Sequence, residues 1–237
     1  MDALSVDPVD ILAFGPHPDD IEVGIGGVVA KHAARGDRVG LCDLTAGELG
    51  SNGTVEQRLA EGEASRAVLG PAWRVNLRLP DRAINSDREH IRVVTGVIRR
   101  ARPRVVAAPY WSDRHPDHVN ACTLIVEAVL NAGLRRYEAG GEAWKVQRLC
   151  HYFLNEAAAP SFLVDVSDQY ELKQRALACH STQFSSQALA TRPNVTRFLQ
   201  LIESRDAHFG AQIGVAHAEG LVTKRPPVAS DLIDGLT

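Results

Sequence analysis

Short apolar runs alternate with stretches of helical period along most of this chain, and that alternation restricts the fold more than any other feature. The first four apolar runs predict strands at residues 9–15, 38–45, 73–79 and 104–110. The stretches of helical period predict helices at residues 21–36, 54–69, 90–102 and 118–133. Because each strand is followed by a helix, the sequence predicts an α/β fold: a Rossmann-like, mostly parallel sheet with helices on both faces.

The second half of the chain continues this pattern less regularly. Two later strands, separated by a short loop, are predicted at residues 146–156 and 161–167. Two more helices are predicted at about residues 169–180 and 195–209. The last segment, from residue 224 onward and roughly 15 residues long, looks like a surface extension. We therefore expect one domain over residues 1–237.

Two local patterns refine the predicted helices. Thr54 and Gln57 are three residues apart at the start of a helical pattern, which predicts a capping box. Gly24, Gly26 and Gly27 fall inside the first predicted helix and weaken its intrinsic preference. We expect these glycines to mark a place where the helix packs closely against the sheet.

Charge and composition exclude several classes of protein. The formal net charge is -3, with 26 basic and 29 acidic residues interspersed, so nucleic acid is not expected as a partner. No apolar run approaches the about 20 residues that span a bilayer, and the acidic N-terminal residues do not resemble a secretory signal. We expect a cytoplasmic protein without a membrane partner. The four cysteines lack a CxxC pair, which favours buried free thiols over disulfides or a zinc–thiolate site.

Two clusters of histidine and aspartate follow two of the predicted strands. "HPDD", residues 17–20, comes directly after the first strand, and "WSDRHPDH", residues 111–118, comes after the fourth. In a parallel sheet, ligands bind where the carboxyl ends of the strands lead into helices. Both clusters therefore project from the same edge of the sheet, and their side chains are expected to meet.

These residue types suit a catalytic metal ion. Imidazole and carboxylate are usual zinc ligands, and a catalytic zinc takes about three of them and keeps one open position. His17 and Asp20 are three residues apart in a turn stiffened by Pro18, and His118 completes a set of three. The sequence predicts that His17, Asp20 and His118 bind zinc.

The remaining polar residues of the two clusters then take catalytic roles. Asp19, between two predicted ligands, is the predicted general base that takes a proton from water. His115, one helical turn from His118, is predicted to donate a proton to the leaving group or to stabilise the oxyanion. Asp117 is predicted to accept the far N–H of a histidine and so to select its tautomer.

Simpler interpretations of these motifs stay open at this point. Asp20 could cap the helix after a loop broken by Pro18, and Asp117 could cap a helix that begins at His118. A dinucleotide site is disfavoured, although Asp43 ends the second strand, because the G-x-G-x-x-G fingerprint is absent.

Four stretches in this order resemble a known enzyme family. "FGPHPDDIEVGIGG", "TAGELGSNGTVEQR", "LPD" and "HPDH" are similar to motifs of the zinc-dependent de-N-acetylases called LmbE-like or PIG-L, which remove acetyl groups from N-acetylglucosamine (GlcNAc) derivatives. The resemblance runs from the first strand almost to the C-terminus. Residues 162–184 and 204–221 resemble the branch that deacetylates GlcNAc-malate in bacillithiol biosynthesis.

This resemblance implies the same metal and catalytic residues as the chemistry above, and it adds substrate contacts. Glu48 and Arg58 are implied in the substrate loop region, and Asp81 of "LPD" is implied to reach the sugar. An alternative for Arg58 is a solvated helix arginine paired with Glu61. His180 resembles a family position near the site but could equally be a helix-end histidine. His217 stands where the branch has a tyrosine, so no role is assigned to either histidine.

The implied substrate is an amino sugar, with GlcNAc-malate as the leading candidate. Another GlcNAc glycoside or a chitobiose-like disaccharide is the nearest alternative, and a non-catalytic metal- or sugar-binding module is an alternative of another class. The resemblance also implies a homo-oligomer and is compatible with a hexamer. Histidine and carboxylate ligands suit iron and cobalt as well as zinc, so the sequence does not select the metal.

Overall fold

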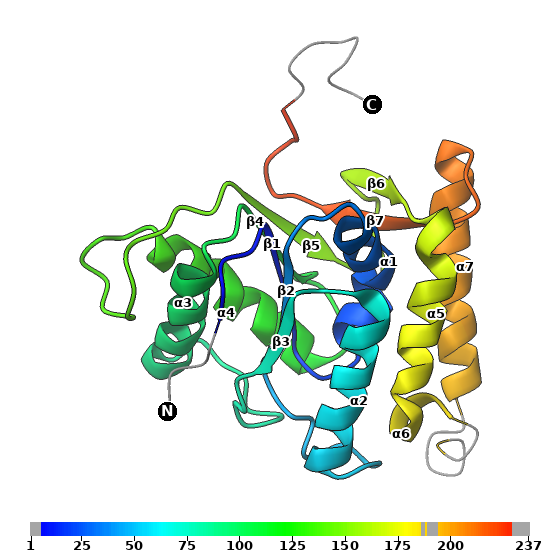
Figure 1. Ribbon diagram of the computed structural model, residues 1–237, viewed down its shortest axis with the longest axis horizontal. Coiled ribbons are helices and arrows are strands. Elements are labelled where there is room, and N and C mark those ends of the chain that lie inside the picture. The colour runs from blue at the N-terminus through cyan, green and yellow to red at the C-terminus, as the bar shows by residue number, and fades with distance from the viewer. Residues whose placement is uncertain (1–5, 186–187, 189–193, 229–237) are drawn as a thin grey trace.

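A computed structural model shows a mixed sheet of seven strands between two layers of helices (Figure 1). It describes residues 6–185, 188 and 194–228. The strand order is β3-β2-β1-β4-β5-β7-β6. The strands are β1 (Ile11–Gly15), β2 (Val39–Asp43), β3 (Trp73–Asn76), β4 (Val105–Pro109), β5 (Arg148–Tyr152), β6 (Phe162–Asp165) and β7 (Ala218–Val222).

The helices alternate with the strands as the sequence predicts. They are α1 (Asp20–Ala34), α2 (Val55–Leu69), α3 (Arg88–Ala101), α4 (Pro116–Ala132), the 3-10 helix η1 (Ser167–Gln169), α5 (Tyr170–Cys179), α6 (Ser181–Phe184) and α7 (Val195–Ile213). The first five strands pair in parallel in a Rossmann-like order, so the predicted α/β fold class is confirmed.

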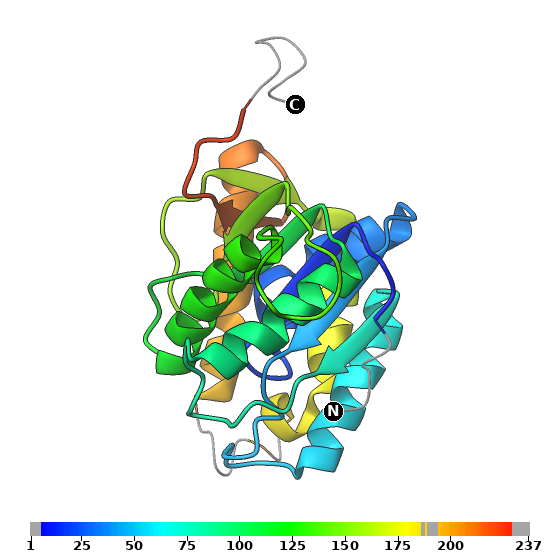
Figure 2. The same cartoon turned by 90° about the vertical axis from the view of Figure 1, so that its left-hand side faces the viewer.

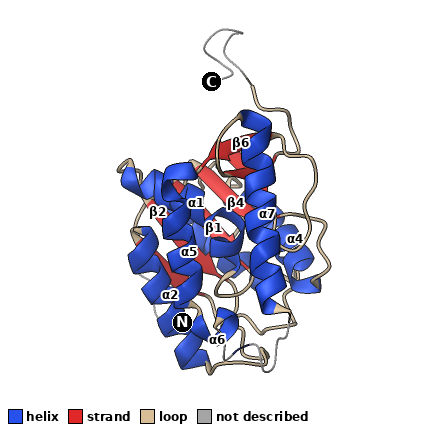
Figure 3. Cartoon of the chain, turned by 90° about the vertical axis from the view of Figure 1, so that its right-hand side faces the viewer, coloured by secondary structure: helices blue, strands red, loops and turns tan. Residues whose placement is uncertain are grey.

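Alternate residues of the central strands face two separate hydrophobic cores. Leu12 and Phe14 of β1 pack with α3 and α4, whereas Ala13 between them faces the other side. On that second face α1, α2, α5 and α7 cover the sheet (Figure 3). The central strands are therefore buried on both faces, as their continuous apolar composition predicts.

The C-terminal part of the sheet differs from the prediction. The sequence predicts two consecutive later strands, but β5 and β6 do not pair with each other. The unpredicted strand β7 lies between them and runs antiparallel to both. It escapes a search for apolar alternation because it carries Glu219 and Gly220.

The third strand is shorter than predicted. Residues 73–79 were expected to be extended, but β3 ends at Asn76 and Arg78 has a φ of 52°. Leu77 and Leu79 stay buried, and their N–H groups donate to carbonyls of Asp43 and Leu44. The apolar run therefore continues as buried loop. The expected surface extension is exposed from Lys224 to Val228, and its remaining residues lie outside the described ones.

Local features of the helices follow the sequence closely. The capping box is present, since the Thr54 hydroxyl accepts from Gln57 N–H and the Gln57 side chain accepts from Thr54 N–H. The expectation that the glycines of α1 pack closely against the sheet is confirmed for Gly24, where a Cβ would lie 2.0 Å from the ring of Tyr152 in β5. The other two pack elsewhere: a Cβ on Gly27 would lie 2.8 Å from Val166, which follows β6, and one on Gly26 would lie 3.2 Å from Lys173 of α5. A side chain at Gly24 or Gly27 would therefore clash with these neighbours.

All four cysteines are free, and Cys42, Cys122 and Cys150 are buried. Cys179 is partly exposed, which corrects the expectation that every thiol is buried. Among the described helices, none is long and apolar enough to cross a bilayer.

Candidate active site

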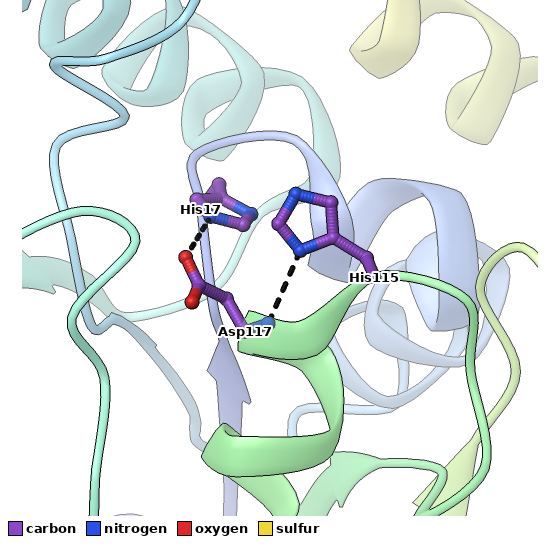
Figure 4. A group of neighbouring side chains, drawn as sticks. All are labelled: His17, His115 and Asp117. Carbon is purple, nitrogen blue, oxygen red and sulfur yellow. Dashed lines mark hydrogen bonds and ion pairs between the residues drawn. The ribbon is translucent and has the colours of Figure 1, made fainter.

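The two histidine and aspartate clusters meet where the strand order reverses, between β1 and β4. His17 follows β1, while His115 and Asp117 come from the start of α4 after β4 (Figure 4). A cavity of about 330 Å³ opens there. Seven of the nine predicted site residues line it: His17, Asp19, Asp20, Arg58, Asp81, His115 and His118. Asp117 is buried and Glu48 is exposed, and neither is part of this lining.

The predicted ligands bring their donor atoms together. His17 Nδ1 lies 3.0 Å from Asp20 Oδ2, and His118 Nε2 lies 3.5 Å from Asp20 Oδ1. Donor atoms of these three residues all lie within 4.8 Å of one another, the arrangement that an ion needs. Asp20 and His118 are buried, and His17 is nearly so.

A second group, His17, His115 and Asp117, also lies within 4.8 Å (Figure 4). Two of its candidate donor atoms already accept backbone N–H groups. His115 Nδ1 accepts the N–H of Asp117 at 3.2 Å, and Asp117 Oδ2 accepts the N–H of Arg82 at 2.9 Å. In the first set Asp20 Oδ2 also accepts a backbone N–H, from His17, but Asp20 Oδ1 and His118 Nε2 face each other at 3.5 Å, so this set fits an ion better.

Carboxylates hold the far nitrogens of both histidine ligands. His118 Nδ1 lies 3.0 Å from Asp113 Oδ1, which leaves Nε2 as the lone-pair donor. His17 Nε2 lies 3.3 Å from both Asp81 Oδ1 and Asp117 Oδ2, which leaves Nδ1 for the ion. Asp117 thus has the contact that its predicted role requires, and Asp81 shares it.

Asp113 is a residue that sequence reasoning missed. Besides His118 it accepts the N–H of His115 at 2.8 Å and both the backbone and side-chain N–H groups of Asn155. Burial opposes ionisation, but these hydrogen bonds bring the pKa of Asp113 below its usual range. Its place in "WSDRHPDH", two residues before His115, was the available signal.

Asp19 sits in a strained and buried position beside the ligands. Its φ of 120° is unusual for a residue with a side chain, and such strain concentrates at functional sites. Burial raises the pKa of Asp19, against the opposing charge of Arg58, whose Nη2 lies 3.5 Å from Asp19 Oδ2. A carboxylate with a raised pKa is a better proton acceptor than an ordinary one.

Arg58 holds this turn in place. Its guanidinium donates to the carbonyls of Pro18 at 2.7 Å and Gly47 at 3.3 Å and is almost fully buried. The alternative of a solvated arginine paired with Glu61 is wrong, because Glu61 instead accepts hydrogen bonds from Ser181 and Thr182.

His115 is the N-cap residue of α4, so the alternative in which Asp117 caps a helix from His118 is wrong. Since His115 Nδ1 accepts a backbone N–H, the neutral ring carries its proton on Nε2. Burial, reinforced by the nearby His118 and His17, lowers the pKa of His115. The ring is therefore arranged as a neutral hydrogen-bond donor.

Comparison with known proteins assigns this site to a family. The family model PIG-L, described as GlcNAc-PI de-N-acetylase, matches residues 12–129, which include both clusters. The diacetylchitobiose deacetylase of Thermococcus kodakarensis is 31% identical over 226 residues, which cover 89% of this chain and 81% of that protein. The chain belongs to the PIG-L family.

Two solved structures share the fold across nearly the whole chain. The conserved protein TT1542 of Thermus thermophilus is 38% identical with a TM-score of 0.85, covering 93% of this chain and 96% of that one. The N,N'-diacetylchitobiose deacetylase of Pyrococcus horikoshii is 25% identical with a TM-score of 0.79, covering 89% and 82%.

In this PIG-L family member, Glu48 and Asp81, which were predicted to contact substrate, hydrogen-bond the two loops that carry them to each other. Glu48 Oε1 accepts the N–H of Asp81 at 2.7 Å, and Asp81 Oδ2 accepts the N–H of Leu49 at 3.0 Å. Asp81 lines the cavity, whereas Glu48 is an exposed residue outside the lining. The reciprocal bonds fix the loop that forms one wall of the cavity.

His180 and His217 take different positions. His180 is fully buried, and its Nε2 lies 3.2 Å from Glu22 Oε1 at angles outside hydrogen-bond geometry. His217 stacks on Tyr170 with ring centroids 3.7 Å apart. Neither lines the cavity. Its wall instead includes residues that sequence reasoning did not single out: Arg82, Arg114, Asn155, Phe184 and Phe198.

Proposed function

We propose that this chain is a metal-dependent hydrolase that removes the N-acetyl group from a small GlcNAc-containing molecule. The observation that carries the proposal is the convergence of His17, Asp20 and His118 beside Asp19, a buried carboxylate outside the ligand set. Membership of the PIG-L family supports it. The reaction consumes water and gives acetate and a free amine.

The proposed ion is zinc. Two imidazoles and one carboxylate fit it, and the far nitrogen of each imidazole contacts a carboxylate, as metal-bound histidines usually do. When bound, such an ion supplies Lewis acidity toward the amide carbonyl. Iron or cobalt would suit the same donors.

The protein groups supply the proton transfers. Asp19 takes a proton from the attacking water, and Arg58 keeps the Asp19 carboxylate oriented. His115, with its proton on Nε2, stabilises the developing oxyanion or donates to the leaving amine. A module that only bound metal or sugar would need neither Asp19 nor His115.

GlcNAc-malate is the proposed substrate. Arg82 and Arg114 line the cavity and would favour a sugar joined to a small acidic group. Phe184 and Phe198, stacked with centroids 6.3 Å apart, offer an apolar surface to a sugar ring. A chitobiose-like disaccharide is the second candidate, because two relatives bear that activity in their names.

The test measures free amine released from GlcNAc-malate and, separately, from N,N'-diacetylchitobiose by the zinc-loaded protein. His118→Ala, which removes a ligand, and Asp19→Asn, which keeps the ligands, are the matched variants. Release that both variants abolish, while Asp19→Asn retains its metal, supports the hydrolase. The preferred compound then identifies the substrate. Release from neither compound by a protein that binds metal would instead favour a binding module.

A further inference from the structure

A second cavity, of about 700 Å³, lies between α3 and the connection from α4 to β5 and shares no lining residue with the candidate active site. That connection runs beside α3 at the left of Figure 1 and faces the viewer in Figure 2. Five arginines line the cavity: Arg88, Arg92, Arg99, Arg135 and Arg136. Glu138 is the one acidic residue of the lining.

Helix periodicity gathers three of these arginines on one face of α3. Arg88 and Arg92 are four residues apart, and Arg99 follows eleven residues after Arg88, or close to three turns. Arg135 and Arg136 approach from the segment that follows α4. Two separate elements therefore contribute positive charge to one concavity.

Arg99 forms the floor of this arrangement. Its side chain donates to four backbone carbonyls, and the residue is only 4% exposed. Within the described residues no carboxylate lies at ion-pair distance from it. The end of the α4 dipole offsets part of the charge, but a buried guanidinium without an anionic partner leaves a positive field in the cavity.

The other four arginines are exposed and only weakly compensated. Arg88, Arg135 and Arg136 form no ion pair with any described residue, and Arg92 pairs only with the exposed Glu89. Such a surface pair contributes little. Guanidinium groups that do not pair with protein carboxylates are available to an external anion.

The cavity lining also includes two glycines, Gly140 and Gly141. Gly140 and Gly141 both adopt positive φ, 70° and 74°, a conformation that favours glycine. Among the described residues, none accepts the N–H of either glycine. Unpaired N–H groups beside arginines are a common feature of phosphate sites.

We propose that this cavity binds a small molecule carrying two phosphate groups. Guanidinium groups match phosphate oxygens in bidentate geometry, and several arginines around one concavity suit more than a single negative charge. The volume is in the range of small-molecule sites. A concave wall favours a compact anion over a flat membrane surface. The proposal does not depend on the deacetylase activity.

The test is titration calorimetry of the zinc-loaded protein with fructose 1,6-bisphosphate and with inorganic phosphate at about 150 mM salt. Arg135→Gln/Arg136→Gln removes two charges from the cavity. The matched control, Arg38→Gln/Arg104→Gln, removes two exposed arginines elsewhere. We expect saturable 1:1 binding of the bisphosphate, weakened at least tenfold in the cavity variant and less than twofold in the control. Amine release should be unchanged in both variants.

Three results would overturn the proposal. One is the absence of saturable binding, and another is equal weakening in both double variants, which would indicate the general field of the surface. The third is binding to phosphatidylglycerol vesicles that requires Arg135 and Arg136, with no binding of the free bisphosphate, because that would assign the surface to a membrane. Urea unfolding of each variant ensures that a loss of binding is not a loss of fold.

Discussion

Replacement of Asp113 by asparagine tests whether the carboxylate behind His118 prepares the metal site. Asp113 Oδ1 lies 3.0 Å from His118 Nδ1, and its oxygens also accept N–H groups of His115 and Asn155. The amide of the variant keeps the shape but loses the charge and one acceptor. With the amide oxygen in place of Oδ1, its NH₂ group would face the backbone N–H of Asn155, so the amide cannot serve every donor.

The expected effect is a weaker metal site in a folded protein. A partner behind a ligand typically contributes 10- to 100-fold in metal affinity, or about 1.4–2.7 kcal/mol. Asp113 is expected toward the upper end, because it is ionised and serves four donors at 2.8–3.0 Å. The zinc affinity should fall by about 30- to 100-fold.

Competition with a chromophoric chelator measures that affinity directly, and Asp168→Asn, at an exposed position, is the matched control. The control should be within twofold of the unchanged protein. An Asp113→Asn protein that is folded and binds zinc with unchanged affinity would refute the reasoning, because His118 would then need no carboxylate to present Nε2.

Three other substitutions have outcomes that follow from single contacts. Asp19→Asn should retain zinc and lower kcat about 100- to 10,000-fold, since an amide cannot take the proton; metal analysis and steady-state rates check both parts. Gly24→Ala should lower the free energy of unfolding, measured with urea, by about 1–3 kcal/mol or more, because the new Cβ would lie 2.0 Å from Tyr152. In the control Gly133→Ala the new Cβ meets nothing closer than 3.6 Å, so the free energy of unfolding should change little. Burial lowers the pKa of His180, but Glu22 outweighs it and the net shift is upward. The raised pKa means that protonated His180 stabilises the fold; this stabilisation is fully present below about pH 6.5 and is lost as pH rises through the raised pKa. Without metal, His180→Asn should therefore lose more free energy of unfolding, relative to the unchanged protein, at about pH 5.5 than at about pH 8.5.

Local patterns predicted the parallel part of the sheet, because each of those strands lies in an apolar run and the first four end before a helix. Strand β7 could not be found in this way. Its Glu219 is buried and accepts from Lys173 Nζ at 2.6 Å and from the N–H groups of Gly27 and Val28. All three partners are distant in sequence, so the chain locally shows only a carboxylate in a place where a strand needs an apolar residue.

The candidate site likewise contains residues that the sequence could predict and residues that it could not. The residues that meet at the cavity could be predicted because strand ends in a parallel sheet share an edge. The partners that orient them depend on tertiary contacts. Asp81 reaches His17, and Arg58 of α2 reaches Asp19, from positions distant in sequence. Residue type alone does not distinguish such an arginine from a solvated one. Asp113 is the exception, because it lies only five residues before His118.

The turn that carries the first cluster is fixed through its backbone. Three carbonyls of residues 14–18 accept hydrogen bonds from three different elements. The pairs are Tyr152 Oη with Phe14 O at 2.6 Å, Thr45 Oγ1 with Pro16 O at 3.0 Å, and Arg58 Nη2 with Pro18 O at 2.7 Å. The bonds from Tyr152 and Arg58 satisfy buried carbonyls, and Pro16 O accepts the backbone N–H of Thr45 at 3.1 Å as well as the Thr45 hydroxyl.

These three bonds explain how the chain tolerates the φ of 120° at Asp19. A strained residue persists only where its surroundings leave no relaxed alternative, and here every second carbonyl leading to Asp19 is held from β5, from the end of β2 or from α2. Tyr152 can reach Phe14 only because Gly24 leaves space for its ring. The glycine that weakens α1 as a helix is thus what allows the turn to hold His17, Asp19 and Asp20 in one arrangement.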